Sequence, residues 1–150
     1  MRAQFVYENL NFERGVLPIG TLQPGTLVIN NKVDPARKPS TSVNDNDNEI
    51  YMFDKWEDSN WDNPRMIIIP IAYMSENKVK LRVPGAGGRY TAEITFPENY
   101  RMLTFKEKEA FEQTVQKSKG SKYFKNWVDK ILKKSKKGIL PYMLSAKTSN

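Results

Sequence analysis

The stretch that decides the fold is SKYFKNWVDKILKKSKKG, residues 121–138. Its large apolar side chains recur at positions i, i+3, i+4, i+7 and i+8, which is the spacing of one face of an α-helix. They are Phe124, Trp127, Val128, Ile131 and Leu132. Ser121 can cap the start of this helix, and Gly138 followed by Pro141 can end it. A helix with one apolar face needs a second layer to pack against, so we expect the rest of the chain to supply one.

The opposite face of this helix is basic. At 100° per residue its outer arc collects the lysines Lys122, Lys125, Lys130, Lys133, Lys136 and Lys137. Asp129 is the only acid among them, and Lys134 lies at the margin of the apolar face. Residues 101–150 hold 13 Lys/Arg against 4 Asp/Glu, whereas residues 1–100 hold 11 against 13. The net charge of +7 therefore arises in the last third of the chain.

A second helix is predicted immediately before the first. Thr104 and Glu107 have the spacing of a capping box, and Gly120 is a natural helix end. The amphipathic pattern between them is weak, with Phe111 and Val115 as the best core contacts.

The residues before 100 favour β-strands and turns. Strand-like segments cover residues 26–29, 49–56 and 65–74, with polar or Pro/Gly-containing stretches between them. Pro70 interrupts the last segment, which indicates an edge or a bulge there. Residues 34–48 are poor in apolar side chains and rich in Pro, Ser, Asn and Asp, so we expect a mobile loop.

Two further segments, residues 78–83 and 89–96, alternate strictly between polar and apolar side chains. The glycine-rich residues 84–88 join them, which predicts a β-hairpin. Facing the apolar residues to one side pairs Val83 with Tyr90, Leu81 with Ala92, Val79 with Ile94 and, on the outer face, Lys80 with Glu93. Arg89 is then expected at the hairpin tip.

Together these elements predict an α+β fold. We expect an antiparallel, meander-like sheet over about residues 26–96, followed by two C-terminal helices packed on it. No βαβ alternation is present, so a parallel sheet is not expected. At 150 residues the chain fits a single domain, residues 1–150, with a mobile loop at 34–48 and a frayed polar C-terminus.

The composition excludes several chemistries. With no cysteine, the chain has no disulfide and no thiolate nucleophile or ligand, and its composition suits a reducing compartment. With no histidine, a Ser-His-Asp triad and a histidine-ligated zinc site are impossible. We therefore expect no catalytic residues, no metal site and no cofactor. No apolar run of about 18 residues occurs, so we expect a cytoplasmic protein without a membrane span.

The concentration of positive charge predicts a polyanionic partner, with nucleic acid, DNA or RNA, as the first candidate. The expected phosphate contacts are Lys122, Lys125, Lys130, Lys133 and Lys137, with Arg89 adding one from the hairpin tip. Lysine is a point charge suited to phosphates, whereas base recognition favours arginine, so we expect little sequence preference. A solvated outer face that serves only solubility is the alternative interpretation of the same lysines.

Two other functions remain open. Trp56 and Trp61 lie in an acidic, aromatic segment that is suited to a protein interface. The carboxylates of the same region also suggest a metal-dependent nuclease, a less favoured hypothesis. Its residues are Asp54, Glu57, Asp58, Asp62 and Glu76, with Lys78 nearby.

The opening residues FVYENLNFERG, 5–15, resemble the start of small uncharacterised bacteriophage proteins. The resemblance implies no activity and no functional residues. It implies a phage-encoded accessory, inhibitor or virion protein, located in the host cytoplasm or in the virion.

Overall fold

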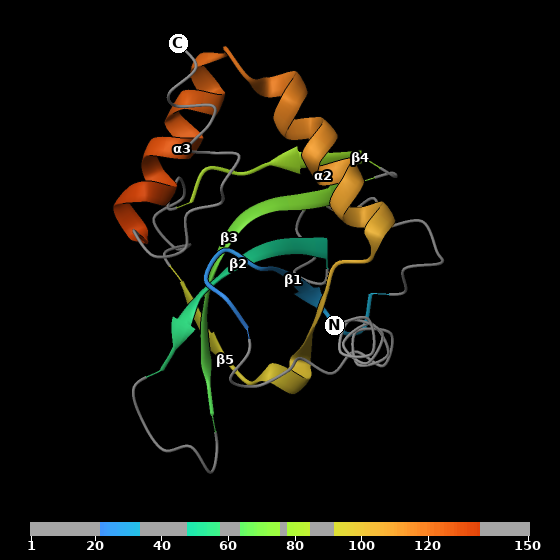
Figure 1. Ribbon diagram of the computed structural model, residues 1–150, viewed down its shortest axis with the longest axis vertical. Coiled ribbons are helices and arrows are strands. Elements are labelled where there is room, and N and C mark those ends of the chain that lie inside the picture. Colours follow the sequence, from blue (N-terminus) through green and yellow to red (C-terminus); the bar gives the residue numbers. More distant parts are fainter. Residues whose placement is uncertain (1–21, 34–47, 58–63, 76–77, 85–91, 136–150) are drawn as a thin grey trace, which may run out of the picture.

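The computed structural model describes residues 22–33, 48–57, 64–75, 78–84 and 92–135. They form a six-stranded antiparallel sheet followed by two helices, so the predicted α+β fold is confirmed. Figure 1 shows both helices on the same side of the sheet. The strands are β1 (Leu27–Asn30), β2 (Glu49–Trp56), β3 (Met66–Ser75), β4 (Lys78–Leu81), β5 (Glu93–Thr95) and β6 (Tyr100–Met102). The helices are the 3-10 turn η2 (Pro97–Asn99), α2 (Phe105–Ser118) and α3 (Lys122–Lys134).

The sheet begins as the predicted meander and then departs from it. The strand order is β4-β3-β2-β1-β6, and β5 pairs with β3 outside this path. Strands β1 to β4 are thus neighbours in chain order. Strand β6 adds to the far side of β1, so the sheet extends past the predicted end at residue 96.

The predicted hairpin between residues 78–83 and 89–96 was wrong. Strand β4 pairs with the second half of β3, where Leu81 lies opposite Ala72. Strand β5 pairs with the first half of β3, where Glu93 lies opposite Ile68. The described strands β4 and β5 therefore pair with successive parts of β3 and not with each other.

The predicted hairpin does not form because β3 is ten residues long and can pair with both segments in turn. Alternation of apolar side chains sets which face of a strand is buried, but it does not say which strand is the neighbour. Ile94, expected in the core, is 55% exposed as a result. Arg89 and residues 85–91 lie outside the described part of the chain.

Two irregularities bend the sheet. The register between β2 and β3 shifts between Ile50 and Tyr51, beside Pro70, and again between Phe53 and Lys55. The bulge expected at Pro70 is therefore present, on a central strand. A bulge increases the local twist and bends its strand, and Figure 1 shows β3 curving from β5 towards β4.

The bend brings the two edges of the sheet together at one end. In a flat sheet, the four strand spacings from β5 to β6 would measure about 19 Å. Residues 96–99 connect these strands, and five extended residue steps reach at most about 17 Å. The turn η2 shortens this reach further, because a 3-10 helix rises only about 2 Å per residue. The sheet must therefore curl, which places Glu93 of β5 against β2 and β6.

Both faces of the sheet are buried. The face under the helices carries a core of strand residues such as Ile29, Ile50 and Ile71, packed against residues of α2 and α3. The helix residues of this core are Phe111, Val115, Phe124, Trp127, Val128 and Ile131. The concave face holds a second, smaller core that includes Val28, Phe53 and Ile68.

The helix boundaries follow their predicted caps with one exception. Thr104 and Glu107 form the capping box of α2, and Gly120, with φ of 91°, follows its end. The Ser121 hydroxyl accepts a hydrogen bond from the Phe124 amide at 3.0 Å and caps α3. Helix α3 ends at Lys134, before the predicted Gly138, because Ser135 is extended and its hydroxyl donates to the buried carboxylate of Asp54.

A buried ion pair fastens α2 to the far edge of the sheet. The Arg101 guanidinium of β6 donates to both carboxylate oxygens of Glu107 at 2.8 and 2.9 Å. It also donates to the Val33 carbonyl at 3.0 and 3.2 Å. Both side chains of the pair are under 10% exposed. Glu107 thus serves both the capping box and the contact between α2 and β6.

Side chains from the helices also bind backbone carbonyls of the β3–β4 edge. The Trp127 indole donates to the Ile71 carbonyl at 2.8 Å, and the Tyr123 hydroxyl donates to the Leu81 carbonyl at 2.8 Å. The Thr114 hydroxyl donates to the Val79 carbonyl at 2.9 Å. Val79 and Leu81 belong to the edge strand β4, so the Thr114 and Tyr123 bonds occupy carbonyls that this strand would otherwise present for pairing. Within the described residues, neither helix is long and apolar enough to cross a membrane.

Candidate functional site

The outer face of α3 carries four lysines that the structure leaves exposed: Lys122, Lys125, Lys130 and Lys133, here called the lysine face. The inner face of the same helix is buried at Phe124, Trp127, Val128 and Ile131, as its periodicity predicts. Lys134 and Asp129 are half-buried. Lys137 and Arg89, the other two predicted phosphate contacts, lie outside the described residues.

The lysine face spans about three turns of helix. From Lys122 to Lys133 the helix rises about 16 Å, and these two residues point within about 20° of each other. Lys125 and Lys130 flank this line on either side. The four charges therefore form a basic strip whose length suits several successive phosphates of a nucleic acid.

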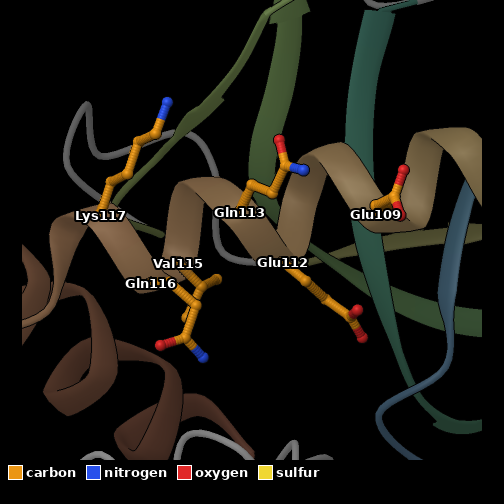
Figure 2. A pocket seen from close by; sticks show the side chains of 6 residues that line it. All are labelled: Glu109, Glu112, Gln113, Val115, Gln116 and Lys117. Carbon is orange, nitrogen blue, oxygen red and sulfur yellow. The ribbon is translucent and has the colours of Figure 1, made fainter.

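The exposed side of α2 differs from the lysine face. A cleft of about 600 Å³ lies beside this helix, lined by Glu109, Glu112, Gln113, Val115, Gln116 and Lys117. Figure 2 shows that these side chains all come from α2 and extend to both sides of it. Two carboxylates and one ammonium group do not favour a polyanion, so the basic strip is a property of α3.

The aromatic residues predicted for a protein interface are not brought together. Trp56 is half-buried, and its ring lies 5.2 Å from that of Phe53 in an edge-on contact. It packs against the second core and so forms part of the wall of that core. Trp61 lies outside the described residues.

The carboxylates of the nuclease hypothesis are also separated by their contacts. Asp54 accepts the hydrogen bond from Ser135, and Glu57 pairs with Arg65 at 3.1 Å. Asp58, Asp62 and Glu76 are outside the described residues. Across the parts of the chain with described placement, no three His, Cys, Asp or Glu side chains are grouped as ligands of a metal ion would be.

The sequence did not predict a cluster of charged and phenolic groups around Glu49. This glutamate begins β2 and is only 3% exposed. Its Oε1 forms an ion pair with Arg82, which follows β4. Its Oε2 is buried and has no hydrogen-bond partner among the described residues. A buried oxygen without a partner is rare in folded proteins, which marks this position as unusual.

A second carboxylate of the cluster, Glu93, is held by two tyrosines. The hydroxyls of Tyr51 and Tyr100 donate to its two oxygens, each at 3.2 Å. The two tyrosine rings also contact edge to face, with centroids 5.5 Å apart. These residues come from β5, β2 and β6, so the curl of the sheet assembles the cluster.

Burial controls the electrostatics of this cluster. Loss of solvent raises the pKa of Glu49 to about 7, although the Arg82 charge opposes the rise and the Glu93 charge adds to it. Burial likewise raises the pKa of Tyr51, assisted by Tyr100 and Glu93. Strongly shifted groups often occur at functional sites. The only sequence signal for Glu49 was its place in phase with Tyr51 and Phe53 on one face of the strand.

No protein-family model, curated protein or solved structure matches this chain. Its function is therefore inferred from the two features above, the lysine face and the cluster around Glu49.

Proposed function

We propose that this protein is a non-enzymatic binding protein that engages a polyanion, nucleic acid first, through the lysine face of α3. The observation that supports this most is the combination of four exposed lysines on one side of α3 with a fully buried Trp127 on the other. A helix held in this way presents its charges from a fixed base. Binding of the lysine side chains to phosphates then requires little further ordering of the helix backbone.

The residue types favour contact with the backbone of the nucleic acid over recognition of bases. The described helix α3 contains lysines and no arginine, and lysine acts as a point charge toward phosphate. Sequence is usually read by arginine, asparagine or glutamine at base edges. Binding should therefore depend steeply on salt and little on sequence.

The proposal predicts a specific salt dependence, measurable by fluorescence anisotropy of labelled single-stranded DNA, duplex DNA and RNA. If the four lysines each contact one phosphate of duplex DNA, affinity should fall about a hundredfold between 50 and 200 mM salt. Replacing all four with glutamine should lower the slope of log K against log salt by about 3.5.

A matched variant separates a local surface from overall charge. Lys55, Lys106, Lys108 and Lys117 are also exposed but lie on β2 and α2. Replacing these four with glutamine removes the same charge and should leave the salt slope close to that of the unmodified protein. Equal losses in both quadruple variants would show that net charge alone attracts the nucleic acid. If the unmodified protein bound none of these nucleic acids at 50 mM salt, the proposal would be contradicted.

A further inference from the structure

Arg82 lies between the Glu49 cluster and the first turn of α3. Its backbone amide donates to the Ile71 carbonyl at 2.8 Å and so continues the β3–β4 pairing by one residue. Figure 1 shows the chain leaving β4 in the direction of α3. The preceding residue, Leu81, accepts the hydrogen bond from Tyr123 of α3. The Arg82 charge also reaches the Tyr123 hydroxyl, where it opposes the burial that raises the pKa of that group.

This position adjoins the lysine face. Tyr123 and Lys130 are seven residues apart, and at 100° per residue they lie on the same flank of α3. A cation beside Tyr123 therefore extends the basic strip on the Lys130 side. The Arg82 side chain is 26% exposed, so it is within reach of the surface while it pairs with Glu49.

The charge on Glu49 is an ion-pair partner that attracts the Arg82 guanidinium inward. The groups facing Glu49 are Arg82 from the β4 edge, Glu93 from β5, and the tyrosines of the neighbouring strands. Tyr51 lies on β2, Tyr73 lies opposite Glu49 on β3, and Tyr100 on β6 shares Glu93 with Tyr51. Lys80 lies opposite Tyr73 on β4 and is exposed. Arg82 is thus the one cation in an ion pair with Glu49 among the described residues.

We propose that Glu49 regulates the polyanion-binding surface by controlling Arg82. When Glu49 is ionised, it holds the guanidinium in the ion pair. When Glu49 takes a proton from solvent, the ion pair is lost and Arg82 turns outward to contact a phosphate on the Tyr123 flank of the lysine face. This inference rests on the proposed function, because it adds one contact to the same surface.

Few other groups of this chain titrate in the pH range where Glu49 changes its charge. The raised pKa of Glu49, about 7, puts the change between pH 6 and pH 8. The chain has no histidine, which is the side chain that ordinarily titrates in this range. The α-amino group also titrates near pH 8, but a substitution at Glu49 leaves it in place.

The test measures binding of a mixed-sequence DNA duplex at pH 6 and pH 8 over a series of salt concentrations. The unmodified protein should bind about five- to tenfold more tightly at pH 6 in 0.1 M salt, with a salt slope steeper by about 0.9. Glu49→Gln should bind at both pH values as the unmodified protein does at pH 6. Arg82→Gln should bind at both as the unmodified protein does at pH 8.

Glu57→Gln is the matched control, since it breaks the more exposed ion pair with Arg65 and should keep the full pH response. The inference is overturned if the duplex binds but its affinity does not change with pH, or if Arg82→Gln keeps the change. Arg82→Gln tests the inference even if Glu49→Gln fails to fold. Absence of duplex binding at either pH would instead overturn the proposed function itself.

Discussion

At Glu49, burial outweighs an adjacent ion pair. The carboxylate loses nearly all of its solvent, and the attraction of one guanidinium does not compensate for that loss, so its pKa rises to about 7. The Oε2 atom without a partner is the structural sign of the same imbalance. Among the described residues, Glu49 is therefore the clearest source of pH-dependent stability near neutrality.

The raised pKa predicts that Glu49 lowers stability as pH rises. Between pH 4.5 and about 7 the folded protein holds a proton that the unfolded chain releases, so the free energy of unfolding falls across this range. The size is about 3 kcal/mol at most, since each pKa unit corresponds to about 1.4 kcal/mol. Urea denaturation of the unmodified protein and Glu49→Gln from pH 4.5 to pH 8 measures it. The difference in stability, unmodified minus variant, should decrease with pH; a rising difference would contradict the account.

A second residue-level prediction concerns the buried pair of Arg101 and Glu107. Replacing Arg101 with leucine leaves a buried carboxylate without its cation and should lower the free energy of unfolding by about 3–5 kcal/mol. Arg65→Leu is the control, because its ion pair with Glu57 is more exposed than the Arg101–Glu107 pair and its guanidinium lies 5.9 Å from the centre of the Phe96 ring. That change should cost about 1 kcal/mol. Similar losses in both variants, measured by urea denaturation, would show that burial does not strengthen the first pair.

At the scale of elements, the end of α3 depends on a contact with a distant strand. The Ser135 hydroxyl donates to Asp54 in the bulge of β2, and both residues are buried. Ser135→Ala should lower stability by about 1–3 kcal/mol, because the Asp54 carboxylate then loses a buried donor. Ser118→Ala removes a hydroxyl bond to a carbonyl within α2, at 2.8 Å, and should cost less. If thermal unfolding gave the two variants the same stability, the Asp54 contact would not fix the end of α3.

An element could be predicted from the sequence when the residues that determine it lie close together in the chain. The caps at Thr104 and Ser121 and the apolar stripe of α3 depend on residues within a few positions, and the sequence predicts them correctly. The partner of β5 depends on where the chain returns after residues 85–91, and no local pattern specifies it. The end of α3 at Lys134 is also non-local, because Ser135 bonds there to Asp54 of a distant strand.

The same distinction separates the two functional features. The exposure of the lysine face follows from the periodicity of one helix, so all four of its residues could be named from the sequence. The cluster of Glu49, Arg82 and Glu93 requires a bulge, a curled sheet and the pairing of both β4 and β5 with β3. The resemblance of residues 5–15 to bacteriophage proteins stays a prediction, since those residues are outside the described part.

At the scale of the whole molecule, charge and architecture are arranged together. The first 100 residues, which supply most of the sheet, carry slightly more acid than base, whereas the last 50 carry the positive excess. The sheet supports α3 from beneath, and α3 displays the cations. On the proposed function, this asymmetric field would attract and orient a polyanion before contact.

The most direct measurement of the central claim is the chemical reactivity of each lysine in the presence and absence of duplex DNA. Limited acylation followed by mass spectrometry reports this for the unmodified protein. The account predicts protection of Lys122, Lys125, Lys130 and Lys133, with Lys55, Lys106, Lys108 and Lys117 unchanged. Protection spread evenly over both sets, or confined to the second set, would contradict the assignment of the polyanion-binding surface to α3.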